Sequence, residues 1–333
     1  MVGCAGRDIL LEARDLRLGF TRGGAREENA LAADGVDLTL ERGKTLCLVG
    51  ESGCGKSVVA LHLLRLLPSP PAKIFGGTVR FKGIDLGALS LTELNRIRGD
   101  RICMIFQDPM TSLNPVMRIG EQMSEGLRLH RGLSAREALR EAEAMLERVG
   151  MPASGVRDFP HQMSGGMRQR VMIGTAMLPG PDMLIADEAT TALDAATSRQ
   201  ILSLMRALLE NSGASMLFIT HDLGIVSRIA DDIAVMYAGR IVEYGPAGAL
   251  LTAPVHPYTV GLLRSRPAGG ERRARLAAIP GSVPGIWDRP SGCAFHPRCS
   301  LATEQCRHDN PPLRDAGGTF SRCAAGAQLR EKS

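Results

Sequence analysis

A glycine-rich segment in the first fifth of the chain restricts the fold more than any other feature. It follows the short apolar run 45–49 and precedes the helix-like sequence VVALHLLRLL. Glycines let a backbone wrap around a chain of phosphates without side-chain clash, and the N–H groups at the start of a helix supply partial positive charge. Strand, loop and helix in this order form the context of a phosphate-binding P-loop, which a chance glycine-rich turn would lack. The loop consists of Gly50, Glu51, Ser52, Gly53, Cys54, Gly55, Lys56 and Ser57.

The chemistry of such a loop assigns roles to its last two residues. Lys56 would pair the β- and γ-phosphates of ATP, and the hydroxyl of Ser57 would hold Mg²⁺. We therefore expect ATP and Mg²⁺ to bind here.

Short apolar runs bounded by polar or turn residues recur along the chain, as buried parallel strands do. Between them, residues 134–149 repeat apolar positions at helical spacing, with Ser134 and Glu137 forming a capping box and Gly150 at the end. Strands that alternate with helices predict an α/β sheet covered on both faces. The runs lie at 46–49, 102–106, 183–186, 216–219 and 233–237.

The two ends of the chain differ from this middle. Residues 10–18 and 31–40 alternate apolar and polar side chains, which predicts half-buried antiparallel strands. From residue 253 onward Pro and Gly become frequent and periodicity fades, so we expect a loop-rich extension over 253–333 behind a domain spanning 1–252.

Composition excludes several classes of protein. Apolar residues make up 44% and charged residues 23%, as in globular proteins, and no apolar run approaches the roughly 20 residues that span a bilayer. The start of the chain has no signal-peptide pattern, so we expect a cytoplasmic protein. The net charge of +5 comes without a basic block interleaved with aromatics, which argues against a nucleic-acid partner.

Two adjacent carboxylates end the apolar run 183–186. Because successive strand residues point to opposite faces, only one of them can aim at a metal ion. We assign Asp187 to Mg²⁺ and Glu188 to the water that attacks the phosphate. Two solvated acids would be the better interpretation of an isolated pair, but a P-loop elsewhere in the chain favours the catalytic one.

The segment Met163-Ser-Gly-Gly-Met-Arg-Gln-Arg170 resembles the signature of ABC ATPases. The resemblance implies a RecA-like P-loop NTPase fold with an antiparallel β subdomain and a helical subdomain at about 108–163. It also implies further site residues in the order that the family shows. These are Gln107 for Mg²⁺ sensing, Asp194 in the D-loop, His221 at the γ-phosphate, and Ser164, Gly165 and Gly166 as a second anion site.

Some of these roles have structural alternatives. Phe20 either stacks on adenine or packs in the core. For His221 alone a structural histidine would be the better interpretation, but its position after an apolar strand favours the catalytic one. The sequence departs from the family at Met163, usually Leu, and at Ala189, usually Pro, and neither change removes a reacting group. We therefore expect a site that hydrolyses ATP.

Several segments narrow the resemblance to the ATPases of oligopeptide, dipeptide and nickel importers. The family implies a second ATPase subunit, in a heterodimer whose signatures each close on the partner's ATP. It also implies two membrane permeases, an extracytoplasmic solute-binding protein, and a place on the cytoplasmic face of the membrane. Peptides are the expected cargo, with nickel or another small solute as alternatives. A non-transport ABC ATPase is disfavoured because there is one signature and no sustained heptad pattern. The segments are 107–115, 186–194, 256–259, 280–285 and 292–299.

Four cysteines crowd the C-terminal region. Five, six and sixteen residues separate Cys293, Cys299, Cys306 and Cys323. These intervals exceed the roughly two to four residues of zinc fingers, and disulfides are disfavoured in a reducing cytoplasm. Four thiolates suit a soft metal, and the resemblance implies a [4Fe-4S] cluster. Zinc and thiols without metal remain alternatives.

Overall fold

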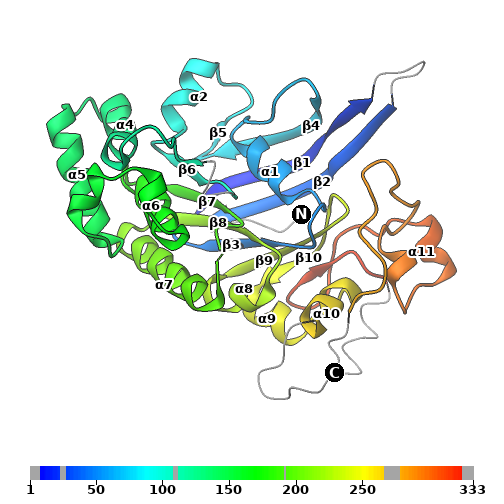
Figure 1. Ribbon diagram of the computed structural model, residues 1–333. Coiled ribbons are helices and arrows are strands. Elements are labelled where there is room, and N and C mark those ends of the chain that lie inside the picture. Colours follow the sequence, from blue (N-terminus) through cyan, green and yellow to red (C-terminus); the bar gives the residue numbers. More distant parts are fainter. Residues whose placement is uncertain (1–7, 23–27, 108–111, 191–192, 266–277, 325–333) are drawn as a thin grey trace. The chain divides into compact units, whose positions relative to one another are not determined.

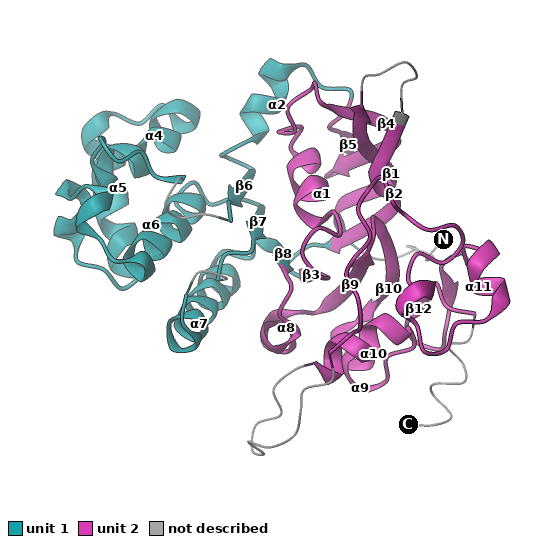
Figure 2. Ribbon diagram, turned by 45° about the vertical axis from the view of Figure 1, so that its right-hand side comes forward, with its two compact units in different colours: residues 1–8, 41–44, 88–219 teal, residues 9–40, 45–87, 220–333 magenta. Residues whose placement is uncertain are grey.

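The computed structural model describes residues 8–22, 28–107, 112–190, 193–265 and 278–324. The chain divides into two compact units, each built from separated stretches of sequence (Figure 2). Unit 1 contains residues 1–8, 41–44 and 88–219, and unit 2 contains residues 9–40, 45–87 and 220–333. The boundary expected at 252 stays a prediction.

Unit 1 has three parallel strands, in which β7 pairs with β6 on one side and with β8 on the other. All residues of β7 and β8 are buried, which explains their uninterrupted apolar sequences and confirms the predicted strands. The strand expected at 102–106 ends one residue early, at Ile105, and Phe106 outside it is 44% exposed. The bounds are Ile102–Ile105 for β6, Met183–Asp187 for β7 and Ser215–Thr220 for β8.

The helices of unit 1 include three that contact one another, α4, α5 and α6 (Figure 1). Helix α5 begins after Ser134 with the predicted capping box and buries Ala138, Ala142, Met145 and Leu146 along one face. Gly150, just after the end of the helix, has φ 76°. This is the left-handed conformation that commonly ends helices and that glycine adopts without strain. The helices are α2 (Leu91–Ile97), α4 (Ile119–Arg131), α5 (Ala135–Arg148), α6 (Gly165–Met177) and α7 (Ala195–Ser212).

Within the expected helical subdomain, 108–163, the described part contains α4, α5 and two 3₁₀ turns, Ala153–Arg157 and Pro160–Gln162. Residues 108–111 lie outside the described part of the chain. Helix α6 continues the helical region beyond the expected end.

Unit 2 contains a sheet in the strand order β2-β1-β4-β5. Strand β4 pairs antiparallel with both β1 and β5, which confirms the antiparallel region expected near the N-terminus. The first two strands are longer than predicted. The bounds are β1 Ile9–Arg22, β2 Glu28–Glu41, β4 Ala72–Phe81 and β5 Ile84–Asp85.

The strand that leads into the glycine-rich loop, β3, belongs to a second group of strands in unit 2. It pairs parallel with β9, which pairs antiparallel with β10. Two short strands from the C-terminal region extend this group, since β12 pairs with β10 and β11 with β12. The C-terminal extension is thus tied to the sheet that carries the loop. The bounds are β3 Thr45–Val49, β9 Asp232–Tyr237, β10 Arg240–Pro246, β11 Arg314–Asp315 and β12 Phe320–Ser321.

The helices of unit 2 are short, and two of them, α10 and α11, lie in the region expected to be mostly loop. Among the residues that the structure describes, no helix of either unit is long and apolar enough to cross a bilayer. The bounds are α1 Lys56–Leu63, α8 Leu223–Ile229, α9 Ala247–Thr252, α10 Pro257–Arg264 and α11 Glu304–His308.

Candidate functional site

The glycine-rich loop depends on its glycines at two positions. At Gly50, directly after β3, a Cβ atom would collide with the carbonyl oxygen of Met236. Gly55 has φ 107°, and a Cβ there would collide with the carbonyl oxygen of Ala32. A residue with a side chain would therefore push the loop away from the strands that hold it.

Lys56 begins helix α1 and turns its ammonium group back into the loop. Its Nζ donates hydrogen bonds to the carbonyl oxygens of Gly50 at 2.7 Å and Glu51 at 3.0 Å, and only 4% of the residue is exposed. The N-cap of α1 is Gly55, which offers no side-chain cap to the first N–H groups of the helix. Ser57, half-buried, lies in this first turn. Cation and helix start thus make a site suited to phosphate.

A second group of predicted site residues lies at the end of β7, in unit 1. Asp187 is the last residue of the strand and is 4% exposed, and the following Glu188 is 8% exposed. Glu188 adopts φ 48°, in the left-handed region that residues with side chains rarely occupy and that recurs at functional sites. The Nε2 of Gln107 donates to its Oε2 at 3.1 Å, so the two residues assigned to Mg²⁺ sensing and to water activation lie in contact.

The signature serine begins helix α6, also in unit 1. Ser164 is its N-cap, and its Oγ accepts a hydrogen bond from the N–H of Met167 at 3.3 Å. Gly165, the first residue of the helix, is exposed, and the next, Gly166, is half-buried. The arrangement has the open helix start that the predicted anion site requires.

Three further predicted residues have positions compatible with their assignments. Asp194 is the N-cap of α7, where bonds from the hydroxyl and N–H of Thr197 hold the pKa of its carboxyl below the ordinary value. His221 directly follows β8 and is exposed. Phe20 is half-buried in β1, opposite Ala72 of β4. The functional roles of these residues stay predictions.

The four C-terminal cysteines line one small cavity of about 20 Å³ in unit 2, together with His256. Each of the four cysteines is half-buried, and burial raises the pKa of Cys293 and of Cys299. His256 is 1% exposed, and burial lowers its pKa to about 3, so the ring is neutral.

The donor set would suit a soft metal, but the space does not. A cavity of this size has room for about one water molecule. Among the described residues, no group of three or more His, Cys, Asp or Glu side chains is placed to hold a metal ion. The arrangement therefore does not fit a [4Fe-4S] cluster without movement of the surrounding segment.

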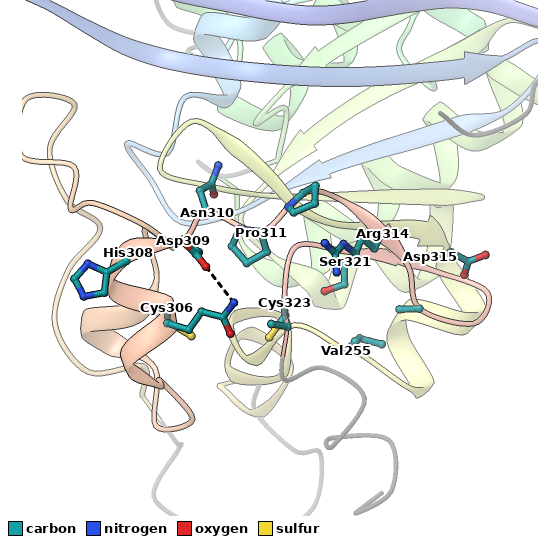
Figure 3. Close-up of a pocket in the computed structure, with 14 residues that line it drawn as sticks. Val255, Cys306, His308, Asp309, Asn310, Pro311, Arg314, Asp315, Ser321 and Cys323 are labelled. Carbon is teal, nitrogen blue, oxygen red and sulfur yellow. Dashed lines mark hydrogen bonds between the residues drawn. The ribbon is translucent and has the colours of Figure 1, made fainter.

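A larger cavity, of about 780 Å³, lies beside these thiols (Figure 3). Cys306 and Cys323 line both cavities. On its wall the Nε2 of Gln305 donates to Oδ2 of Asp309 at 3.0 Å. Two of the four thiols are therefore accessible from this larger space.

Two residues that touch the loop were not predicted. The hydroxyl of Tyr258 accepts a hydrogen bond from the N–H of Glu51 at 2.8 Å, and the guanidinium of Arg298 forms an ion pair with the Glu51 carboxylate at 2.7 Å. Both belong to segments, 256–259 and 292–299, whose sequences resemble importer ATPases, but that resemblance assigned them no role.

Comparison with known proteins assigns a family to these features. Residues 33–191 match the family described as "ABC transporter", and residues 242–306 match "Oligopeptide/dipeptide transporter, C-terminal region". A protein of Brucella melitensis with the provisional name peptide import ATP-binding protein is 49% identical over 320 residues, covering 92% of this chain and 94% of the relative. A second protein of that organism, with the same provisional name, is 48% identical over 316 residues and covers 94% of each chain.

Solved structures agree. The ATP-binding cassette MJ0796, in a dimeric post-hydrolysis state bound to ADP and Pi, is 27% identical, with a TM-score of 0.63 over 72% of this chain and 99% of that one. The cbiO1 protein of Clostridium perfringens, 24% identical with a TM-score of 0.60, covers 73% of this chain and 90% of its own and supports the fold. The P-loop NTPase fold expected from the sequence is confirmed. The chain is a member of the ABC transporter family, in the group that carries the oligopeptide/dipeptide transporter C-terminal region.

Proposed function

We propose that this chain is the ATP-hydrolysing subunit that powers the import of peptides through an ABC permease. The contact between Gln107 and Glu188, at the strained end of β7, carries the hydrolytic part of the proposal. The peptide import named for the Brucella relatives, at 48–49% identity over nearly the whole chain, supports the transport part.

The residues of the loop would bind the triphosphate. The ammonium of Lys56 exchanges the carbonyl oxygens of Gly50 and Glu51 for phosphate oxygens, which are charged and therefore stronger acceptors. The uncapped N–H groups of α1 add donors for the same phosphates.

Hydrolysis would use the residues after β7. Glu188 accepts a proton from the attacking water, and the amide of Gln107 holds its carboxylate in position. Ser57, Gln107 and Asp187 supply oxygen ligands of the kind that Mg²⁺ prefers. The ion, when bound, neutralises charge on the phosphates. His221 contacts the γ-phosphate, and Ser164 with its two glycines closes on the nucleotide held by a second ATPase subunit.

Replacement of Glu188 tests the hydrolytic role. Glu188→Gln should leave MgATP affinity intact and lower turnover about 1000-fold, because the amide cannot accept the proton. Glu210→Gln is the matched control, since it makes the same change on the exposed carboxylate of an i,i+4 ion pair in α7. Undiminished ATPase activity in Glu188→Gln contradicts the assignment.

The partners and the cargo need the assembled transporter. We propose a second ATPase subunit, two permease subunits and an extracytoplasmic solute-binding protein, with this chain on the cytoplasmic face of the inner membrane. In proteoliposomes supplied with the binding protein, oligo- or dipeptides should stimulate ATPase activity. The peptides should accumulate on the side of the membrane that carries this chain. If nickel or another small solute stimulates the activity and peptides do not, the proposed cargo is wrong and the proposed ATPase role stands.

We also propose that the four C-terminal thiols bind a metal group, with [4Fe-4S] the first choice and zinc the second. Support comes from the donor chemistry and from the gathering of all four thiols around one cavity, which in the structure is too small for the metal group. Binding requires the segment around the cavity to open. Anaerobically purified full-length protein should contain iron and acid-labile sulfide, or zinc. Protein that contains neither contradicts the proposal.

A further inference from the structure

Glu51 of the phosphate-binding loop makes three contacts with three different groups. Its N–H donates to the hydroxyl of Tyr258 at 2.8 Å, and its carbonyl oxygen accepts from the Nζ of Lys56 at 3.0 Å. Its carboxylate accepts two hydrogen bonds from Arg298, Nη1 to Oε2 at 2.7 Å and Nη2 to Oε1 at 3.0 Å. One residue thus joins the P-loop lysine to the C-terminal extension.

Arg298 belongs to the four-cysteine lobe, defined here as residues 278–324, and directly precedes Cys299. The lobe holds its guanidinium firmly. Nε donates to the carbonyl oxygen of Pro280 at 2.7 Å and Nη2 to that of Gly281 at 3.3 Å. Only 5% of the Arg298 side chain is exposed, whereas 31% of the Glu51 side chain is.

An aromatic cluster supports both contacts with Glu51. The guanidinium carbon of Arg298 lies 5.7 Å from the ring centroid of Tyr237 and 5.9 Å from that of Phe295. These rings pack edge-on against each other, and both contact the ring of Tyr258. Tyr258 is fully buried, so its hydroxyl is fixed as well. Arg298 and this aromatic cluster therefore offer the loop a rigid surface.

The charge of Glu51 makes this contact more than structural. A carboxylate in a loop that binds phosphates repels them, and the bidentate pairing with a guanidinium offsets that repulsion. An unpaired Glu51 would also be free to leave the position from which its carbonyl oxygen holds Lys56.

We infer that Arg298 is a positioning residue for nucleotide binding, through which the four-cysteine lobe neutralises Glu51 and holds the phosphate-binding loop in its ATP-accepting shape. The inference rests on the proposed function. If the inference is right, the affinity for ATP depends on how firmly the segment between Cys293 and Cys299 is held in place.

Charge removal at both partners separates this role from simple stabilisation. In the full-length chain, Arg298→Gln should raise the Kd for MgATP about tenfold, because the carboxylate is left uncompensated beside the phosphates. The double variant with Glu51→Gln should return to within about threefold of the unmodified protein, since it removes the repulsion. Arg307→Gln is the matched control, as Arg307 makes an exposed pair with Glu304 in the same lobe, and its Kd should not change.

A purely structural role of Arg298 predicts a different result for the double variant. If Arg298 only stabilises the lobe, the double variant binds MgATP no better than Arg298→Gln, and that result overturns the inference. An unchanged Kd in Arg298→Gln overturns it as well.

Tyr258→Phe covers the case in which Arg298→Gln fails to fold. This variant deletes one buried hydroxyl oxygen and should raise the Kd about threefold by releasing the N–H of Glu51. An unchanged Kd in Tyr258→Phe then counts against the inference. Failure of the unmodified protein to bind MgATP would contradict the proposed function itself. If the unmodified protein binds MgATP normally and the Arg298 and Tyr258 variants bind it with an unchanged Kd, only this inference is contradicted.

Discussion

Helices α5 and α6 of unit 1 begin in the same way and differ in what the start leaves open. Each has a serine N-cap whose Oγ accepts a hydrogen bond at 3.3 Å from the N–H three residues later, Ser134 from Glu137 and Ser164 from Met167. Both serines are exposed. By the cap alone the two helix starts are indistinguishable.

The residue at the third helical position makes the difference. In α5 the carboxylate of Glu137 accepts from the N–H of Ser134 at 2.9 Å and from its hydroxyl at 2.6 Å, so a negative charge already occupies the helix start. In α6 that position is Met167, two glycines precede it, and the first turn contains no acidic residue. The first start is closed by its own anion, and the second can accept one from outside. The comparison separates a serine that stabilises a helix from one that we propose to bind phosphate.

Closing α6 in the manner of α5 should have the largest effect. Met167→Glu rebuilds the capping box, so the melting temperature of the full-length protein should hold or rise. The ATPase activity of the assembled transporter should fall about 100-fold or more, because the new carboxylate repels the incoming phosphates.

Met167→Gln is the matched control for that change. Glutamine also completes a capping box but carries no charge, so its ATPase activity should fall much less. Equal activity in the two variants contradicts the view that an open helix start is what distinguishes α6.

Removal of the α6 cap should have a smaller effect on activity. Ser164→Ala deletes one hydroxyl that could bond a phosphate oxygen, and we expect about tenfold lower ATPase activity from the loss of one charge-assisted hydrogen bond. Stability should drop by about 1 kcal/mol because the N–H of Met167 loses its acceptor. ATPase activity and thermal unfolding of the same preparation measure both effects, and full activity contradicts the role proposed for Ser164.

The contrast between α5 and α6 was accessible to the sequence because each cap lies within four residues. The capping box of α5, and the buried strands β7 and β8, follow from local spacing and from uninterrupted apolar runs. Contacts across long stretches of chain were not accessible. Arg298 and Glu51 are 247 residues apart, and nothing in either local sequence indicates that their side chains pair.

The four C-terminal cysteines also show that local sequence does not determine long-range packing. Their number and chemistry suggested a metal, but whether four thiols gather around an ion depends on how the loops of 278–324 pack. In the structure that packing leaves a cavity of only about 20 Å³. Spacing along the chain carries no information about such a volume.

The α5 cap should affect stability alone. Ser134→Ala removes the same hydroxyl as Ser164→Ala, from the same position of a helix start in the same unit, and should destabilise the protein by about 1 kcal/mol. Its ATPase activity should stay within about twofold of the unmodified protein, since Glu137 already excludes an anion there. A loss of activity as large as that of Ser164→Ala would show that both effects come from helix stability.

The smallest effect is a dependence of the α5 cap on pH. Hydrogen bonds from the hydroxyl and the N–H of Ser134 lower the pKa of Glu137 below its ordinary value of 4.5. The folded state therefore stabilises the ionised form of Glu137 relative to the unfolded state. This contribution to stability is complete at pH values above 4.5 and is lost as the pH falls through the lowered pKa.

Glu137→Gln should therefore unfold more easily than the unmodified protein at neutral pH, and the difference should shrink as the solution is acidified. Since the group is exposed, the whole effect is small. Thermal unfolding of both proteins at matched pH values measures it. Ser164→Ala is the control, because α6 has no acid in its first turn and the stability difference of that variant should not change with pH. A difference for Glu137→Gln that stays constant on acidification would mean that the carboxylate does not hold the cap.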